Sequence, residues 1–183
     1  GDYGPTGNYY ERQIERWTKQ YRASETETVP DMDALIDWLQ SNLPDDDGRL
    51  TLVHGDYRID NLLFAKDKPT CVAVLDWELS TLGHPFADLA AVIMQWSLPP
   101  GDTGRGLAGV DRVALGIPED QAFIDAYCAR MGLAAIDRFG FYLAFCFFRM
   151  ASILQGVKRR ALDGNASNPA RALELGQFVP AFA

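Results

Sequence analysis

Hydrophobic residues recur at helical spacing in two segments near the start of the chain, residues 9–22 and 31–43. Their apolar positions return every three or four residues, as one face of an α-helix requires: Tyr10, Ile14, Trp17 and Tyr21, then Leu35, Ile36, Leu39 and Leu43. The pattern therefore predicts two amphipathic helices before the first candidate strand.

Short β-prone runs follow at residues 50–53, 61–65 and 71–75. The last two are separated by Lys-Asp-Lys-Pro at 66–69, a sequence typical of a turn. We expect these two runs to form a hairpin, which would bring the loop between the first two runs against the end of the third.

The rest of the chain has the periodicity of helices. We predict them at residues 86–97, 118–131, 136–162 and 169–178. The most apolar part of the third, 141–154, is shorter than the ~20 residues of a membrane span and contains Arg149, so we interpret it as a buried helix. The predicted fold class is α+β, predominantly helical with a small β-hairpin, in a single domain over residues 1–183.

Polar residues of a particular kind gather around the predicted hairpin. Asp56 follows His54-Gly55, Asn61 closes the same loop, and Asp76 ends the last strand. A carboxylate placed beside a hydroxyl, with an Asn and a second Asp that hold a divalent ion, is what phosphoryl transfer requires. Little covalent chemistry is left to the protein in that reaction, which depends on positioning and charge neutralisation.

The motif at residues 54–61, His-Gly-Asp-Tyr-Arg-Ile-Asp-Asn, resembles the catalytic loop of the aminoglycoside phosphotransferase and choline kinase group. Residues 76–78, Asp-Trp-Glu, resemble the metal-binding motif of that group, whose fold is related to the protein kinases. Together with residues 83–90, these motifs are most similar to phosphotransferase-like domains fused to, or encoded beside, acyl-CoA dehydrogenases. The resemblance implies the C-terminal lobe of a protein-kinase-like fold, with the hairpin carrying the catalytic and metal-binding loops.

The resemblance also implies roles for individual residues. Asp56 would be the catalytic base or orienting group for the acceptor hydroxyl. Asn61 and Asp76 would bind the nucleotide through Mg²⁺, with Glu78 as a further candidate metal ligand. Arg58 would contact the transferred phosphoryl group, where a guanidinium stabilises charge on the equatorial oxygens. The cofactors implied are ATP and Mg²⁺.

Two more features bear on this loop. The resemblance implies that Asp88 braces the catalytic loop through hydrogen bonds, and we expect His54 to bond within the loop instead of transferring protons. Residues 104–109 fit G-x-G-x-x-G, but they follow a predicted helix and lie after the catalytic loop, contrary to the context of a phosphate-binding loop. We interpret them as a flexible loop, a candidate cover for the acceptor site.

Nothing before His54 resembles the first lobe of a kinase, which supplies a Gly-rich turn and a strand Lys to the nucleotide. We therefore expect that the N-terminal nucleotide lobe is not part of these 183 residues and that this fragment alone is inactive. The missing lobe of the same protein is an expected partner.

The composition of the chain argues against some classes of partner. A formal net charge of −8 argues against nucleic acid and anionic membranes as partners, because both favour clustered Lys and Arg. The 3 cysteines show no metal or disulfide spacing, which is typical of a reduced, cytoplasmic protein.

Three hypotheses follow. The first is an ATP- and Mg²⁺-dependent small-molecule kinase with a hydroxyl acceptor, for which the resemblance suggests a hydroxylated acyl thioester before an aminoglycoside, and an association with an acyl-CoA dehydrogenase. The second is a catalytically silent binding or regulatory module of the same fold. The third is a metal-dependent hydrolase that uses the same carboxylates on water. The intact Asp56, Asn61 and Asp76 favour the first.

Overall fold

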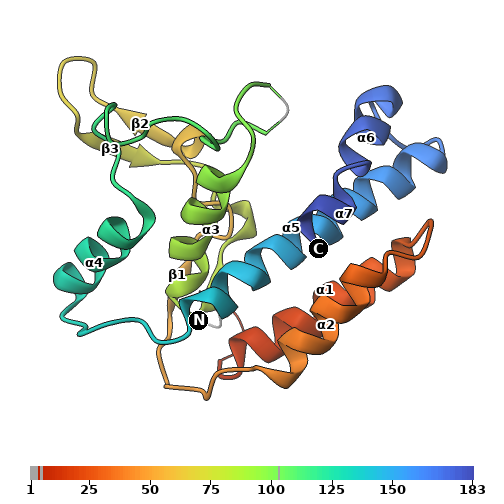
Figure 1. Cartoon of the computed structure of the whole chain (residues 1–183), viewed down its shortest axis with the longest axis horizontal. Coiled ribbons are helices and arrows are strands. Elements are labelled where there is room, and N and C mark those ends of the chain that lie inside the picture. Colours follow the sequence, from red (N-terminus) through yellow and green to blue (C-terminus); the bar gives the residue numbers. More distant parts are fainter. Residues whose placement is uncertain (1–3, 5, 103) are drawn as a thin grey trace. The chain divides into compact units, whose positions relative to one another are not determined.

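The computed structural model describes residue 4 and residues 6–102 and 104–183. The chain forms two compact units, one of residues 1–6 and 49–142 and one of residues 7–48 and 143–183 (Figure 1). The single domain expected over residues 1–183 stays a prediction.

The second unit is helical throughout its regular structure. It contains α1 (Tyr9–Ser24), α2 (Pro30–Ser41), most of α5 (Phe139–Leu162), α6 (Pro169–Gly176) and α7 (Val179–Phe182). The helices predicted from the apolar spacing are confirmed, with ends that differ by a few residues. Pro30 begins α2, where the missing amide hydrogen of proline breaks no helical hydrogen bond.

The apolar faces of α1 and α5 pack together in this unit. The ring of Tyr10 meets Phe145 edge-on, with centroids 5.2 Å apart. The Arg149 guanidinium lies 5.4 Å from the centroid of the Trp17 ring, a contact that places this cation against an aromatic face. At the far end, Gln155 donates a 2.7 Å hydrogen bond to the carbonyl of Ser24.

Among the described residues, α5 alone has the length and mean hydropathy, 1.4 over its most apolar part, of a helix that could cross a membrane. Central helices of soluble proteins share both properties. In α5, Phe145, Phe148 and Ala151 are buried within the second unit, so the predicted buried helix is confirmed at these positions.

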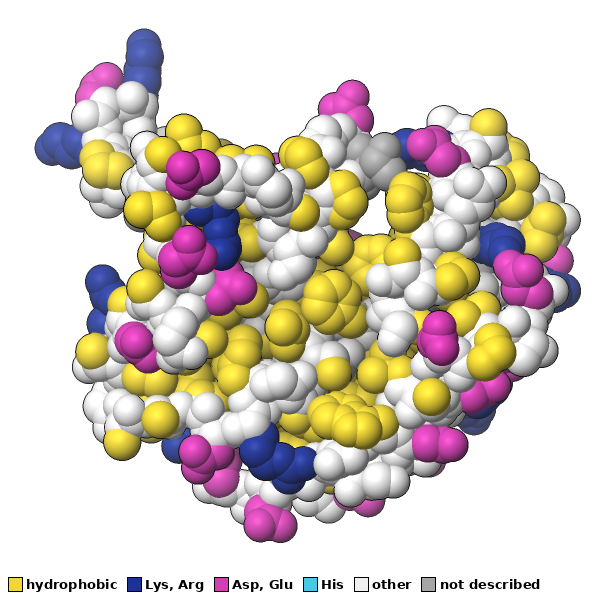
Figure 2. Space-filling view, in the orientation of Figure 1, with side chains coloured by type: hydrophobic (Ala, Val, Ile, Leu, Met, Phe, Trp, Pro, Cys, Tyr) yellow, Lys and Arg dark blue, Asp and Glu magenta, His cyan; other side chains and the backbone are white. Residues whose placement is uncertain are grey.

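The first unit carries the strands. β2 (Leu62–Phe64) and β3 (Cys71–Val74) form the predicted antiparallel hairpin, and Figure 2 shows charged side chains at the end of the hairpin, where its turn lies in Figure 1. β1 (Thr51–Val53) pairs instead with β4 (Thr81–Gly83). β4 is not predicted from the sequence, because its three residues, which end at Gly83 before His-Pro, offer no alternation of apolar and polar positions.

Two helices complete this unit, α3 (Phe86–Ser97) and α4 (Asp120–Met131), together with the short 3-10 turns η1 (Ile59–Asn61) and η2 (Trp77–Leu79). The start of α3 is buried: Phe86 contacts the ring of Tyr142 edge-on at 5.2 Å, and Arg49 lies 5.0 Å from the centroid of the Phe86 ring. The contact with Arg49 fixes the start of α3 relative to the segment that leads into β1.

Candidate active site

The loop after β1 is held by one carboxylate on α3. Asp88 accepts hydrogen bonds from the backbone amides of His54, at 2.7 Å, and Gly55, at 3.0 Å. Both amides donate to a charged acceptor, so each bond is stronger than a bond between neutral groups. The predicted bracing role of Asp88 is confirmed.

The imidazole of His54 is buried and makes one hydrogen bond within the loop and one to the residue that follows β3. Nε2 lies 2.7 Å from the carbonyl oxygen of Leu75, and Nδ1 accepts a 3.2 Å bond from the amide of Asp56. A carbonyl oxygen only accepts, so these partners fit the neutral tautomer with its proton on Nε2. The bond with Asp56 confirms the predicted bonding of His54 within the loop, and the bond with Leu75 also links the loop to the end of β3. The His54 ring lies 4.6 Å from that of Trp77.

Asp56 and Asn61 face each other across the loop. The Asn61 Nδ2 group donates to both the carbonyl oxygen of Asp56, at 2.9 Å, and its Oδ2, at 3.0 Å. Because the amide nitrogen is used in this way, the Oδ1 of Asn61 points away from Asp56 and remains a potential ligand for a cation.

Asp76 enters the site at the end of β3. The amide of the preceding Leu75 donates to the carbonyl oxygen of Asn61 at 2.8 Å, so the two predicted metal ligands are neighbours in the backbone. Asp76 has φ 63° and ψ 55°, the left-handed region that a non-glycine residue seldom occupies. Such conformations cost energy and concentrate at functional sites. The next residue, Trp77, fixes the turn by donating to Val74 at 2.8 Å.

The donor set at this place suits a hard cation. Asn61 and Asp76 offer oxygen ligands, and Glu78 lies on the adjoining turn η2. Mg²⁺ is bound in proteins by one or two such groups together with waters and substrate phosphates. No group of three or more His, Cys, Asp or Glu side chains suited to a metal occurs in the described part of the chain. The two oxygen-bearing side chains of Asn61 and Asp76 match the number of protein ligands in such sites.

Arg58 lies in an ionic cluster that the sequence analysis did not anticipate. Its Nε donates to Oδ2 of Asp60 at 3.0 Å, and its Nη2 contacts the same oxygen. Arg105, from the loop after α3, brings Nη1 to 3.5 Å from that oxygen. The hydrogen bond from Arg58, and to a smaller extent Arg105, holds the pKa of Asp60 below its ordinary value. The motif at residues 54–61 contains Asp60 but predicts no role for it.

The G-x-G-x-x-G loop at 104–109 uses its amides internally. The N–H groups of Gly106, Leu107 and Ala108 donate to Pro99, Trp96 and Leu98 at 2.9–3.0 Å. These amides are therefore not available to a phosphate, which agrees with the interpretation from sequence context. The same bonds tie the loop to the end of α3.

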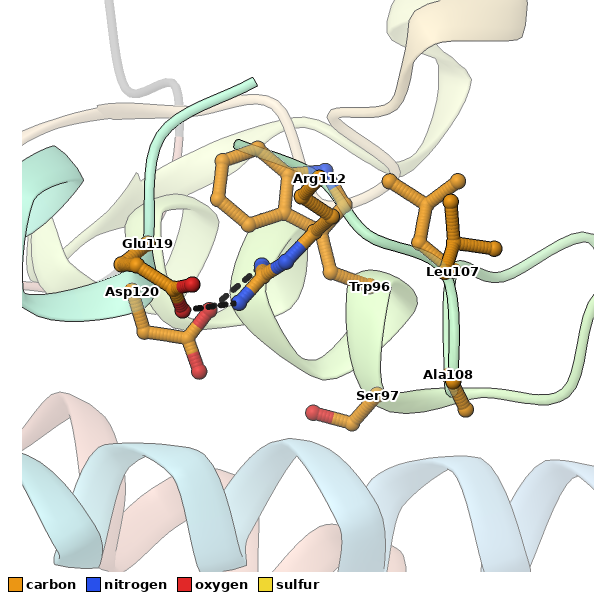
Figure 3. A pocket seen from close by; sticks show the side chains of 9 residues that line it. Trp96, Ser97, Leu107, Ala108, Arg112, Glu119 and Asp120 are labelled. Carbon is orange, nitrogen blue, oxygen red and sulfur yellow. Dashed lines mark hydrogen bonds and ion pairs between the residues drawn. The ribbon is translucent and has the colours of Figure 1, made fainter. Parts of the chain in front are cut away.

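A pocket of about 230 Å³ opens beside this loop (Figure 3). Arg112 dominates it: the guanidinium lies 5.1 Å from the centroid of the Trp96 ring and donates to Asp120 at 2.7 Å and Glu119 at 3.2 Å. Its charge is thus already matched by carboxylates. The volume is below the roughly 300–1,000 Å³ that is usual for small-molecule sites.

The sequence of residues 1–119 matches the profile of the phosphotransferase enzyme family. The chain belongs to this family. A crystal structure from Ralstonia eutropha, of a protein assigned as an aminoglycoside phosphotransferase, has 51% sequence identity and a TM-score of 0.93, over 100% of this chain and 55% of that one. The predicted α+β fold, the C-terminal lobe of a protein-kinase-like structure, is thereby confirmed.

Curated relatives of this chain are much longer proteins. Mouse acyl-CoA dehydrogenase family member 10 is 48% identical over 99% of the chain and 17% of its own length. Mouse acyl-CoA dehydrogenase family member 11 is 42% identical over 97% of the chain and 23% of its own length. The chain thus spans about a fifth of these relatives, and the predicted resemblance to phosphotransferase-like domains associated with acyl-CoA dehydrogenases is confirmed.

Proposed function

We propose that this chain is the catalytic part of an ATP- and Mg²⁺-dependent phosphotransferase that phosphorylates a hydroxyl group of a small molecule. The observation that supports it best is the contact between Asp56 and Asn61 on a loop braced by Asp88 and joined to Asp76 through the backbone of Leu75. A base and two metal ligands on one braced framework are what in-line phosphoryl transfer needs.

In this proposal the side chains divide the work. Asp56 orients the acceptor hydroxyl and accepts its proton, while Asn61 holds Asp56 by Nδ2 and binds Mg²⁺ by Oδ1. Asp76 is the second metal ligand, and Glu78 holds the metal or one of its waters. Arg58 offers its guanidinium to the phosphoryl oxygens, where developing charge is stabilised by a fixed cation.

For the acceptor we propose a hydroxylated acyl thioester, and an aminoglycoside as the weaker candidate. The first rests on the relatives named as acyl-CoA dehydrogenase family members, in which the matched segment is a minor part of the chain. The same relatives support an association with an acyl-CoA dehydrogenase. We further propose a cytoplasmic location, from the reduced cysteines expected from the sequence.

We also propose that the nucleotide-binding site is completed by residues outside these 183. Large apolar side chains around the candidate loops are exposed in the first unit: Leu50, Leu52, Ile59, Leu63, Phe64, Val72, Leu75, Trp77 and Leu79. The chain also accounts for 55% of the R. eutropha protein that it matches. A first lobe over this surface would bury it and supply the other nucleotide contacts, so the 183 residues alone should transfer phosphate negligibly.

The test is a screen for acceptor-dependent ATP consumption with the full-length protein, over hydroxylated acyl thioesters, other hydroxylated metabolites and aminoglycosides. We expect Mg²⁺-dependent turnover with one acceptor class and its loss in Asp56→Asn. Binding of Mg-ATP without turnover on any acceptor would favour the silent module. ATP hydrolysis that no acceptor stimulates would favour a hydrolase.

A further inference from the structure

The cluster of Arg58, Asp60 and Arg105 points to a positioning device beside the catalytic loop. We propose that Asp60 holds the guanidinium of Arg58 in the orientation needed for phosphoryl transfer, and that Arg105 holds Asp60. The inference rests on the proposed function, because it assigns Arg58 an orientation toward a phosphoryl group.

The geometry leaves the useful edge of Arg58 open. An arginine side chain has five N–H donors in a rigid, planar fork. Asp60 takes the Nε edge and one hydrogen of Nη2. The two hydrogens of Nη1 and the second of Nη2 are not engaged by Asp60. One hydrogen from each of Nη1 and Nη2 can therefore bind phosphate oxygens in a bidentate way. A Lys at this place could not be held by one edge and present another.

Arg105 lies on a turn whose backbone conformation is tightly restricted. It has φ 53°, in the left-handed region, between Gly104 and Gly106. A Cβ atom at Gly104 would lie 2.2 Å from the carbonyl oxygen of Pro99, and one at Gly106 would lie 2.0 Å from that of Leu98. Neither position accepts a side chain, so both glycines are needed for the turn to approach the end of α3 this closely.

Further bonds fix the backbone of this turn. The Arg105 amide donates to Gly101 at 2.8 Å, and Gln95 donates from Nε2 to the carbonyl oxygens of Gly104, at 3.1 Å, and Arg105, at 3.2 Å. α3 therefore supports the catalytic loop from both of its ends. Asp88, in its first turn, holds the amides of the loop, while Gln95, in its last, holds the turn whose arginine reaches Asp60.

The experiment separates positioning from nucleotide binding. Calorimetry on the full-length protein compares the affinity for Mg-ADP alone with that for Mg-ADP and aluminium fluoride, whose planar complex mimics a phosphoryl group in transfer. We expect fluoride to tighten binding in the wild type. In Asp60→Asn the affinity for Mg-ADP alone should stay unchanged. The factor by which aluminium fluoride raises that affinity, here called the tightening, should fall roughly tenfold, as expected for losing one charge-assisted hydrogen bond. Arg105→Gln should reduce the tightening less.

A double-mutant cycle makes the inference specific. In an Arg58→Lys background, Asp60→Asn should cost nothing further, because the guanidinium that Asp60 holds is gone. Asp67→Asn, a carboxylate exposed in the hairpin turn, is the matched control and should behave as wild type. Additive losses from Arg58→Lys and Asp60→Asn would overturn the positioning role, as would full tightening in Asp60→Asn.

Failure of the inference and failure of the proposed function are distinguishable. If fluoride does not tighten Mg-ADP binding in the wild type, the proposed phosphotransferase function and this inference both fall. If it tightens binding equally in the wild type and in Asp60→Asn, only the inference falls. Asp60 is half exposed, and Arg105→Lys, which keeps the charge but changes the reach, gives a second readout if Asp60→Asn folds poorly.

Discussion

Removal of the Asp88 carboxylate should loosen the catalytic loop before anything else in the first unit. The two amides that it holds, on His54 and Gly55, are bound at 2.7 and 3.0 Å. Hydrogen bonds to a charged group are worth ~1.5–3 kcal/mol each, and an amide left without its acceptor adds a desolvation cost. Asp88→Asn keeps one acceptor and turns an NH₂ toward the second amide, so we expect a loss of about 2 kcal/mol. Asp88→Ala removes both acceptors and should cost about 3–5 kcal/mol.

Hydrogen exchange is the suitable assay, since unfolding of a chain with two compact units need not be a single transition. Exchange of the His54 and Gly55 amides should accelerate by roughly 30-fold in Asp88→Asn, the equivalent of 2 kcal/mol, while amides in α1 and α2 stay unchanged. Asp125→Asn, which alters an exposed carboxylate bonded to Gln121, is the control and should leave the exchange rates of both sets of amides unchanged. Unchanged protection of both amides in Asp88→Ala would refute the bracing role.

Two other predictions concern folding. Gly55 has φ 83°, and a Cβ there would lie 2.6 Å from the carbonyl oxygen of Leu79. In thermal melts, Gly55→Ala should therefore destabilise the protein by more than Gly116→Ala, where φ is 75° but nothing lies within 4 Å; equal losses would contradict the close approach. Tyr21 is fully buried, its hydroxyl finds no hydrogen-bond partner among the described residues, and burial raises its pKa to about 12. Because the folded pKa exceeds the unfolded value of 10.0, this group favours folding below pH 10 and loses that contribution as the pH rises toward 12. Urea unfolding at pH 8 to 11 should show a decline that Tyr21→Phe reduces without loss of stability at pH 8; an equally steep decline in Tyr21→Phe would exclude Tyr21 as its source.

Most helices and the central hairpin could be predicted from the sequence, because α1, α3 and β2–β3 are marked by apolar periodicity and by turn residues. β4 could not, since its three residues owe their strand conformation to pairing with β1, a tertiary contact. The predicted end of α5 at Leu162 is confirmed, whereas the helix begins at Phe139, three residues after the predicted Ile136.

For the candidate site, the motifs at 54–61 and 76–78 were enough to propose Asp56, Asn61 and Asp76, which the structure brings together through the Asp56–Asn61 contact and the Leu75–Asn61 backbone bond. Local spacing also predicted the bond of His54 within its loop. Arg105 could not be found in this way. Its contact with Asp60 spans a long stretch of sequence and depends on two glycines that pack against α3, whereas the sequence offered only a glycine pattern out of context. An arginine between two glycines after a predicted helix indicates a turn, but it does not indicate which residue the arginine contacts.

The division of roles between Asp56 and Asp76 is the central claim, and nucleotide affinity measured beside turnover tests it most directly. In the full-length protein, Mg-ATP affinity is determined by calorimetry, and phosphoryl transfer is followed with the acceptor found in the screen. Asp56→Asn should leave the affinity nearly intact and depress kcat, because a group that acts on the acceptor in the transition state contributes little to the bound ground state. Asp76→Asn should weaken Mg-ATP binding as well as turnover, because a metal ligand is lost from both states. Parallel losses of nucleotide affinity in the two variants would contradict the account.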